Sequence, residues 1–250
     1  MNQWFKRIFI GIMRGRITIN IGDINARFRV YSVRELQQVQ NISREKILLD
    51  RIFGELRSGD TIFDIGASIG THTIPIAINL QNDGSVIAFE PEERAAQRLR
   101  RNVALNHLTN VNVIQQLLCS IDGSADLYVD DSRVPSGLHT IIPVDNRRAA
   151  PTAASRGDSL ISSGACPTPN LVKIDVEGAE LEVIEGLSGA LKNPACRLVI
   201  CEVHPALLKL TGKSHTDVES ILTSLGFINM QRFDRGSEYH LIASKNRTES

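Results

Sequence analysis

Asp64-Ile65-Gly66-Ala67-Ser68-Ile69-Gly70 is the stretch that decides the fold, and Glu90-Pro91 follows it about twenty residues later. In the first stretch an apolar run ends in a turn of small residues, and the next apolar run ends in an acid. Glycines let a backbone approach a nucleoside closely, and an acid at the end of the second strand suits the ribose hydroxyls. The pattern predicts a strand–turn–helix–strand unit that binds a nucleoside, although two glycines alone do not say which one.

Outward from this unit, apolar runs alternate with stretches of helical periodicity. The expected strands are residues 61–65, 86–90, 111–118, 171–176 and 198–203. Thr216 and Glu219 suggest a capping box for the last helix, which Gly226 should end. Residues 227–233 and 239–243 flank a glycine-containing turn and predict an antiparallel hairpin. The sequence therefore predicts an α/β fold with a mostly parallel sheet and an antiparallel C-terminal hairpin.

The N-terminal part follows a different pattern. Polar and apolar residues alternate over 17–30 around Gly22-Asp23, which predicts a β-hairpin, and residues 47–56 carry the apolar stripe of a helix. We expect residues 1–58 to form an N-terminal cap and residues 59–250 the nucleoside-binding domain. Residues 1–16 are basic and apolar without an acid, which suits either a packed terminal helix or weak peripheral contact with a membrane.

Composition narrows the class of protein. The formal net charge is zero over 250 residues, so we expect no nucleic-acid partner. The four cysteines form no CxxC pair, which favours buried thiols in a reducing compartment, and hence the cytoplasm, over a metal site. The oligomeric state stays open. Residues 122–170 are irregular and rich in small residues, and we expect an extended loop there, either a lid over the acceptor or a tolerated insertion.

The ordered motifs of the chain resemble those of the FkbM-type methyltransferases over about residues 61–243. They are the stretch 64–70, Ala88-Phe89-Glu90-Pro91, Asn102 with Leu105-Asn106, Asp158-Ser159-Leu160, and Lys173-Ile174-Asp175-Val176-Glu177-Gly178-Ala179-Glu180. The last motif is the most specific. The resemblance implies a class I (Rossmann-like) methyltransferase fold, S-adenosylmethionine as methyl donor, and a hydroxyl oxygen as the usual acceptor.

Three positions depart from the family's pattern. Ser68 stands where the family commonly has asparagine, and Cys119-Ser120 replaces the usual serine and aspartate. Pro75 falls where the first helix should run, which predicts a late start or a kink of that helix. These departures bear on how tightly the donor is held.

The residues expected to bind the donor are Asp64, Gly66, Ala67, Ser68, Gly70, Glu90 and Pro91. Glu90 would accept hydrogen bonds from both ribose hydroxyls, a task that suits a carboxylate. Asp64 would face the amino-acid end of the donor. Gly66 and Gly70 would let the turn pass under the ligand, and their alternative is ordinary turn and packing glycine.

The expected catalytic residues are Asp175, Glu202 and His204, which follow two predicted strands. Asp175 would offset the sulfonium charge or orient the acceptor hydroxyl. His204 would act as the general base, because its ordinary pKa lies near neutrality; its alternative is a structural role before Pro205. Glu177 is open between a role in the site and stabilisation of the next helix.

We therefore predict S-adenosylmethionine-dependent O-methylation of a hydroxyl on a sugar, a lipid or a secondary metabolite. A nicotinamide-dependent oxidoreductase is one alternative, but Ser68 lies between the glycines and the full GxGxxG pattern is absent. A metal-dependent methyltransferase would need more clustered carboxylates than Asp175 and Glu202. A Rossmann-like interaction module without activity is the non-enzymatic alternative.

Overall fold

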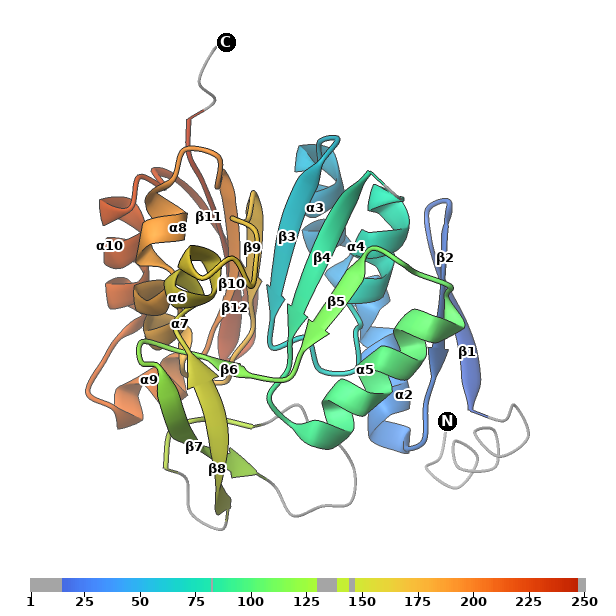
Figure 1. The fold of residues 1–250 in the computed structure, drawn as a ribbon, viewed down its shortest axis with the longest axis horizontal. Helices are drawn as coiled ribbons and strands as arrows, with labels where there is room; N and C mark the ends of the chain where they lie inside the picture. Colours follow the sequence, from blue (N-terminus) through green and yellow to red (C-terminus); the bar gives the residue numbers. More distant parts are fainter. Residues whose placement is uncertain (1–14, 82, 130–138, 144–146, 247–250) are drawn as a thin grey trace. The chain divides into compact units, whose positions relative to one another are not determined.

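A computed structural model describes residues 15–81, 83–129, 139–143 and 147–246 (Figure 1). Its contacts divide the chain into two compact units. The first unit comprises residues 15–60 and 67–115, and the second comprises residues 61–66 and the described residues from 116 onward. The sequence-based division near residue 58 stays a prediction. Most of the predicted segment 1–16 lies outside the described residues.

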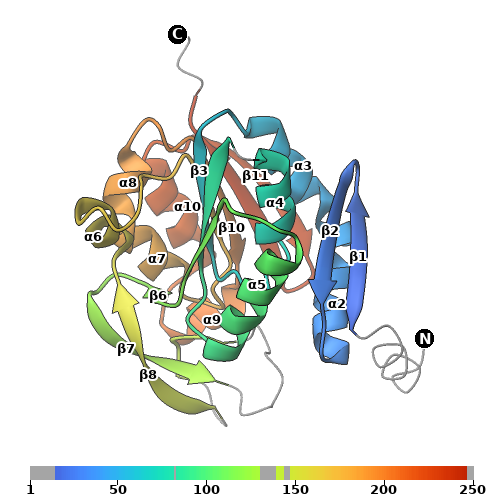
Figure 2. The same ribbon diagram turned by 45° about the vertical axis from the view of Figure 1, so that its right-hand side comes forward.

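The first unit begins with the predicted hairpin. Strands β1 (Arg16–Ile21) and β2 (Ile24–Arg29) pair antiparallel, with Ile21 opposite Ile24 across the turn. Ala26 and Phe28 on β2 are fully buried, and β2 packs against α4 (Thr73–Leu80) and α5 (Glu93–Leu105), as Figure 2 shows. The alternation of polar and apolar residues was therefore a correct guide to this hairpin.

Two helices follow the hairpin. The helix α2 (Val33–Asn41), which the sequence analysis did not predict, starts at Ser32, whose hydroxyl accepts a hydrogen bond from the Glu35 N–H. A 3-10 turn, η1 (Ile42–Glu45), leads into α3 (Lys46–Glu55). The expected stripe of α3 was partly wrong, because Ile47 is 56% exposed while Leu49 is fully buried. Helical periodicity fits either face here, and packing selects the one that carries Leu49.

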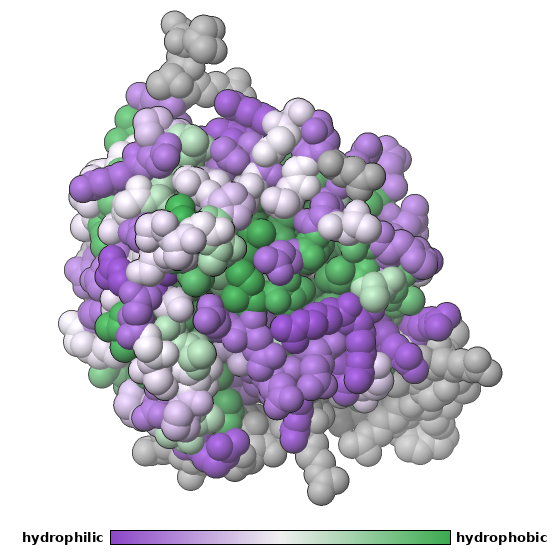
Figure 3. All heavy atoms as spheres, viewed as in Figure 1, coloured by the Kyte–Doolittle hydropathy of each residue, from purple (hydrophilic) through white to green (hydrophobic). Residues whose placement is uncertain are grey.

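The rest of the first unit holds α4, β4 (Gly84–Phe89), α5 and β5 (Val111–Ile114), with β4 and β5 parallel. The helix α4 starts late, at Thr73, so Pro75 lies in its first turn, where a backbone N–H has no partner within the helix. Glu92 caps α5 by accepting hydrogen bonds from the Arg94 and Ala95 N–H groups. The outer face of α5 is hydrophilic (Figure 3).

The second unit holds a sheet of strand order β11-β12-β10-β9-β3. Strands β3 (Asp60–Ile65), β9 (Leu171–Ile174) and β10 (Leu198–Val203) run parallel, whereas β12 (Glu238–Ser244) pairs antiparallel with β10 and with β11 (Asn229–Arg235). The carboxyl ends of the parallel strands therefore lie on one edge, and the side chains that follow them come together there. The predicted parallel strands and C-terminal hairpin are confirmed.

Four helices accompany this sheet: α7 (Glu180–Gly186), α8 (Ser188–Lys192), α9 (Pro205–Leu210) and α10 (His215–Ser224). The capping box of α10 is formed by Ser214 and Asp217, not by the expected Thr216 and Glu219. Gly226, with φ of +94°, ends this helix as predicted. Within the described residues none of the helices combines the length and the apolarity needed to cross a bilayer.

The stretch between residues 111 and 170 differs most from the expectation. The single strand expected over 111–118 is two strands, β5 and β6 (Leu117–Leu118), and β6 belongs to a separate sheet. The extended loop expected over 122–170 is wrong for the described part, which folds into β7 (Gly123–Val129), β8 (Arg148–Ser155) and α6 (Gly157–Ser162). β8 consists mostly of small residues, so little apolar alternation announces it. The lid role is untested.

Candidate active site

The turn after β3 has the backbone of a tight, left-handed turn. Gly66 and Gly70 have φ values of +79° and +93°, and Ser68 has a φ of +50°. The Ala67 N–H donates a hydrogen bond to the Phe89 carbonyl at 3.0 Å, and the Gly70 N–H donates to the Ala67 carbonyl at 2.9 Å. The predicted strand–turn–helix is therefore confirmed, and its centre is fixed by backbone hydrogen bonds.

Packing alone explains both glycines of this turn. A Cβ atom at Gly66 would lie 1.9 Å from the carbonyl oxygen of Asp175, and one at Gly70 would lie 2.5 Å from Cδ1 of Leu99. Both distances are shorter than side chains tolerate, and both residues have positive φ. The turn-and-packing interpretation of these glycines is supported by the structure, while their contact with the donor stays a prediction.

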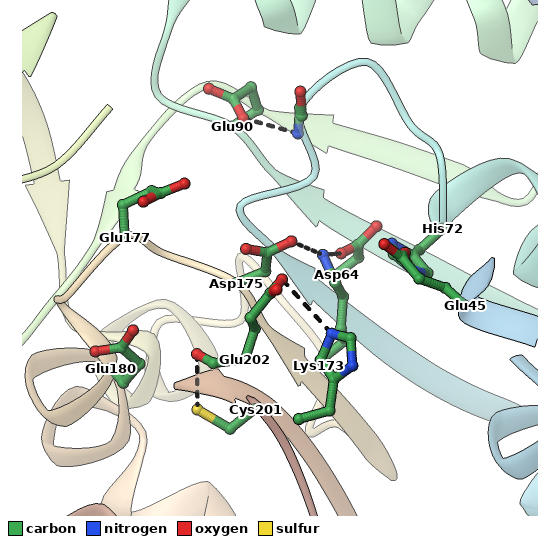
Figure 4. A network of polar contacts seen from close by, with 12 residues as sticks. Glu45, Asp64, His72, Glu90, Lys173, Asp175, Glu177, Glu180, Cys201 and Glu202 are labelled. Atoms are coloured by element: carbon green, nitrogen blue, oxygen red, sulfur yellow. Dashed lines mark hydrogen bonds and ion pairs between the residues drawn. The ribbon is translucent and has the colours of Figure 1, made fainter. Parts of the chain in front are cut away.

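Glu90 follows β4 and is 6% exposed. Its Oε2 accepts a hydrogen bond from the Ser68 N–H at 2.8 Å, and its Oε1 accepts one from the Glu92 N–H at 2.9 Å (Figure 4). The carboxylate is therefore held in one orientation by two backbone groups. A carboxylate has two acceptor oxygens, a set that suits two vicinal hydroxyls.

Ser68 adds a polar group to the same place. Its hydroxyl oxygen is buried and has no hydrogen-bond partner among the described residues. Buried polar atoms in folded proteins normally have a partner, so a lone one is explained by a water or a ligand. Ser68 and Glu90 therefore fit a ligand that carries hydroxyl groups, as the ribose of a nucleoside does. Pro91 directly follows Glu90.

Lys173 is the centre of an ion-pair group at the end of β9 that the sequence analysis did not identify. The residue is 4% exposed, and its Nζ lies 3.1 Å from Asp64 Oδ1 and 3.2 Å from Asp175 Oδ2, as Figure 4 shows. Burial opposes the charge of Lys173, but the two carboxylates outweigh it and hold the pKa of this ammonium above its usual range. A lysine inside an otherwise apolar strand was the available signal.

This ion pair fixes both aspartates. Asp64 is fully buried on β3, and the Asp175 N–H donates a hydrogen bond to the Ile65 carbonyl at 3.0 Å. The Asp175 side chain is 29% exposed, so it is the most exposed member of the group. Asp64 is therefore held by a buried lysine, and its role at the amino-acid end of the donor stays a prediction.

Glu202 and His204 lie at the end of β10, as predicted. Glu202 Oε1 accepts a hydrogen bond from Arg235 Nη1 at 2.9 Å, and Glu202 Oε2 lies 3.6 Å from His240 Nε2. Both of these neighbours of Glu202 come from the C-terminal hairpin, Arg235 from β11 and His240 from β12. This pairing joins two segments that are far apart in the sequence.

His204 is buried between two glutamates. Its Nδ1 lies 2.6 Å from Glu180 Oε1, and its Nε2 lies 3.7 Å from Glu177 Oε2. Burial opposes protonation, but the hydrogen bond to Glu180 and the charge of Glu177 outweigh it and raise the pKa of His204 to about 10. At neutral pH this ring is an imidazolium without a basic nitrogen. This pKa argues against the general-base role expected for His204, which stays a prediction.

Glu177 lies in the turn between β9 and α7. Gly178 has φ of +89°, which confirms the predicted turn, and α7 begins at Glu180. The Gly178 N–H donates to Glu180 Oε1, so Glu180 and not Glu177 serves the start of the helix. Burial raises the pKa of Glu177 to about 7, with His204 opposing this effect and the neighbouring carboxylates adding to it.

Asp175, Glu202 and His204 each place a potential metal ligand atom within 4.8 Å of the other two. In the structure, Asp175 is paired with Lys173, Glu202 with Arg235, and His204 with Glu180. These side chains form an ion-pair network in the structure, and the expectation that the site holds no metal stays a prediction.

The comparison with known families agrees with this geometry. The family model of the methyltransferase FkbM domain matches residues 64–228, from the aspartate at the end of β3 to the segment before β11. The chain belongs to the FkbM methyltransferase family. The resemblance of the motifs is thereby confirmed, and the donor of this FkbM-family chain is S-adenosylmethionine. A nicotinamide cofactor is not supported.

Two curated relatives align with most of the FkbM-family chain. The hexuronic acid methyltransferase AglP of Haloferax volcanii is 31% identical over 214 residues, which are 85% of this chain and 82% of AglP. The 31-O-demethyl-FK506 methyltransferase FkbM of Streptomyces tacrolimicus is 28% identical over 226 residues, and the match covers 76% of this chain and 82% of that protein.

Solved structures show the same fold. The methyltransferase FkbM from Methylobacillus flagellatus superposes with a TM-score of 0.51 at 15% identity, over 84% of this chain and 59% of that one. A precorrin-6y C5,15-methyltransferase from Geobacter metallireducens gives 0.51 at 14% identity, over 80% and 89%. The FkbM-family chain therefore has the predicted class I methyltransferase fold.

Proposed function

We propose that this chain transfers the methyl group of S-adenosylmethionine to a hydroxyl oxygen of a small molecule or a sugar. The observation that carries the proposal is the geometry of Glu90, a buried carboxylate held by two backbone N–H groups beside the unpartnered Ser68 hydroxyl. Family membership supports the reaction, and this arrangement supports the proposal that Glu90 binds the ribose.

The proposed donor residues are those of the sequence analysis. Glu90 accepts hydrogen bonds from the ribose hydroxyls, and Ser68 Oγ provides a further polar contact. Gly66, Ala67, Gly70 and Pro91 shape the backbone of the two turns that flank this carboxylate. Asp64, held by Lys173, stands at the start of the first turn and serves the amino-acid end of the donor.

The proposed acceptor side consists of the partly exposed Asp175 with Glu202 and His204. S-adenosylmethionine supplies a methyl group bound to a positively charged sulfur. The carboxylate of Asp175, fixed by Lys173, orients the hydroxyl that attacks this methyl group. Holding the two reacting atoms in line at near-contact distance supplies most of the acceleration of such a displacement.

The names of the relatives support a class of acceptor. AglP is a hexuronic acid methyltransferase and is 31% identical to this chain, so a sugar that carries a uronic acid is the first acceptor to test. The zero net charge supports an acceptor other than nucleic acid. The four free and buried cysteines support a location in the cytoplasm. The basic residues 1–16 support weak peripheral contact with a membrane as part of the same proposal.

Titration calorimetry with S-adenosylmethionine tests the donor site. Glu90→Ala removes the acceptor of two hydrogen bonds, and hydrogen bonds to a charged group contribute about 1.5–3 kcal/mol, so we expect binding at least tenfold weaker. Glu93→Ala is the matched control, because Glu93 is an acid in the first turn of α5 whose carboxylate accepts a hydrogen bond from Gln97 of the same helix. Unchanged affinity in Glu90→Ala, with the same melting temperature as the wild type, would refute this site.

Labelled S-adenosylmethionine tests the reaction itself. The wild type is incubated with the labelled donor and glucuronic acid, and the product is separated and treated with mild alkali. We expect an alkali-stable methyl ether. An alkali-labile label would show transfer to the carboxylate instead, and would contradict the hydroxyl acceptor while leaving methyl transfer intact.

A further inference from the structure

Among the described residues, Glu177 differs from Asp175 and Glu202 in its cationic neighbour, because His204 is itself bonded to Glu180. Asp175 faces Lys173 at 3.2 Å, and Glu202 faces Arg235 at 2.9 Å. Glu177 instead lies 3.7 Å from His204 Nε2, a distance too long for a hydrogen bond. Its lone pairs are thus less committed to a cation than those of the other two carboxylates.

The position of Glu177 is fixed through its backbone. The hydroxyl of Thr140 donates a hydrogen bond to the Glu177 carbonyl oxygen at 2.6 Å, and Gly178 provides the turn that follows. The Glu177 side chain is 17% exposed. The carboxylate is therefore held largely out of water by a rigid turn, yet it remains within reach of a ligand.

His204 is held as a cation beside this carboxylate. Glu180 is fully buried and contacts His204 Nδ1 at 2.6 Å, which orients the ring and leaves Nε2 directed toward Glu177. A buried imidazolium near a carboxylate supplies a fixed positive charge. His204 therefore cannot take up a proton, but it can set how readily Glu177 does.

The surroundings of Glu177 bring it close to the proton affinity that a base needs. Burial raises its pKa to about 7, His204 lowers it, and the charges of Asp175, Glu238 and Glu202 raise it. Asp175 directly follows β9, Glu202 lies on β10 and Glu238 lies on β12, so the effect arises from the assembled sheet. A general base works best when its pKa lies near the working pH.

We propose that Glu177 is the general base that removes the proton of the acceptor hydroxyl, and that His204 and Glu180 are its positioning residues. This inference rests on the proposed O-methylation and names the residue that completes it. His204 was the base expected from the sequence, and the inference replaces it with a neighbour from the preceding turn.

The step balances without a further reactant. The acceptor oxygen forms a bond to the methyl carbon while the bond between that carbon and sulfur breaks, and its electron pair stays on sulfur. The proton of the hydroxyl passes to a carboxylate oxygen of Glu177. The neutral acid then releases this proton to water before the next turnover, which a pKa near 7 permits.

The pH dependence of kcat/KM with glucuronic acid as the acceptor tests the inference. For the wild type we expect a rise of tenfold per pH unit that levels off near pH 7. In Glu177→Gln we expect kcat/KM to fall by about 10²- to 10⁴-fold and no longer to rise with pH in this way. The affinity for S-adenosylmethionine should be unchanged. Glu182→Gln is the matched control, since it removes a nearby acid of α7 that pairs with Lys213.

His204→Asn supplies a readout that a merely structural role would not give. Removing the imidazolium takes away the charge that lowers the pKa of Glu177, so the rise of kcat/KM should move to higher pH. The inference would be overturned if the rise of kcat/KM with pH is unchanged in His204→Asn, or if it persists in Glu177→Gln. So would activity that a chelator removes and Mg²⁺ restores, because the acids would then bind a metal ion.

Carbon-13 NMR of glutamate-labelled protein tests Glu177 without any acceptor. We expect one carboxyl signal that titrates near pH 7 in the wild type and is missing in Glu177→Gln. Absence of such a signal in the wild type would overturn the inference.

If Glu177→Gln keeps full activity and the product is alkali-labile, the acceptor is a carboxylate that needs no base, and methyl transfer stands. If the wild type binds no S-adenosylmethionine, the proposed function fails instead.

Discussion

Glu90 is buried and Glu177 is partly buried, and both follow a parallel strand, yet they are held in opposite ways. Glu90 receives two backbone N–H groups, one on each oxygen. Glu177 is fixed by its own carbonyl, while its side chain faces other acids and one imidazolium. A carboxylate held by the backbone has a fixed direction and suits binding. One held among charges has an adjustable proton affinity and suits proton transfer.

The largest effect on stability should come from removing Lys173, the cation that pairs with Asp64 and Asp175. Lys173→Met leaves the fully buried Asp64 without its counter-charge, and breaking a buried pair in this way costs about 3–5 kcal/mol. We expect the free energy of unfolding to fall by that amount in urea denaturation. A fall of less than about 1 kcal/mol would show that Asp64 and Asp175 do not depend on Lys173 for the stability of the fold.

The control for this variant is Lys46→Met. Lys46 also forms a close pair, with Asp50 at 2.6 Å, but both side chains are more than half exposed. Exposed pairs contribute little to stability, so we expect only a small change. The contrast separates burial from the mere presence of an ion pair.

A smaller effect is expected for the stability of Glu177→Gln. The pKa of Glu177 in the folded chain, about 7, lies above its ordinary value of 4.5. The stability that this group contributes is therefore fully present below pH 4.5 and is lost as the pH rises through 7. We expect Glu177→Gln to match the wild type at pH 4.5 and to exceed it at pH 8 by roughly 1–2 kcal/mol in urea denaturation. A variant less stable than the wild type at pH 8 would contradict the raised pKa.

The smallest effect is expected on the binding side. Ser68→Ala removes the hydroxyl that has no partner among the described residues, so it should leave stability unchanged. One hydrogen bond contributes about 0.5–1.5 kcal/mol, which corresponds to roughly two- to tenfold weaker binding of S-adenosylmethionine in calorimetry. Lower stability with unchanged affinity would show that the hydroxyl serves the fold. Ser68→Gly, which also tolerates positive φ, is the companion variant.

Much of the fold could be predicted because its elements have strong local patterns. The continuous apolar run of β10 and the alternation in β1 and β2 each identify a strand without tertiary information. β8 could not be found in this way, since its small residues give little contrast between its faces. The exposure of Ile47 could not be predicted either, because the helical period does not say which face will be covered.

The candidate site divides in the same manner. Glu90 could be chosen from its place after a strand and about twenty residues beyond a glycine turn. The role of His204 could not, because its protonation depends on Glu180 and Glu177, which reach it only when β9, β10 and α7 come together. Lys173 was overlooked since a single lysine in a strand does not reveal which carboxylates it will meet.

The sequence by itself determined the family of this protein, its methyl donor and the strand ends that carry its polar residues, because these follow from motifs and periodicities that are local in the chain. Only the tertiary structure decided which acids are paired and which one titrates near neutral pH. Burial and the charges of distant segments set the pKa of each group, and neither exists before the sheet that joins β9, β10 and β12 has formed.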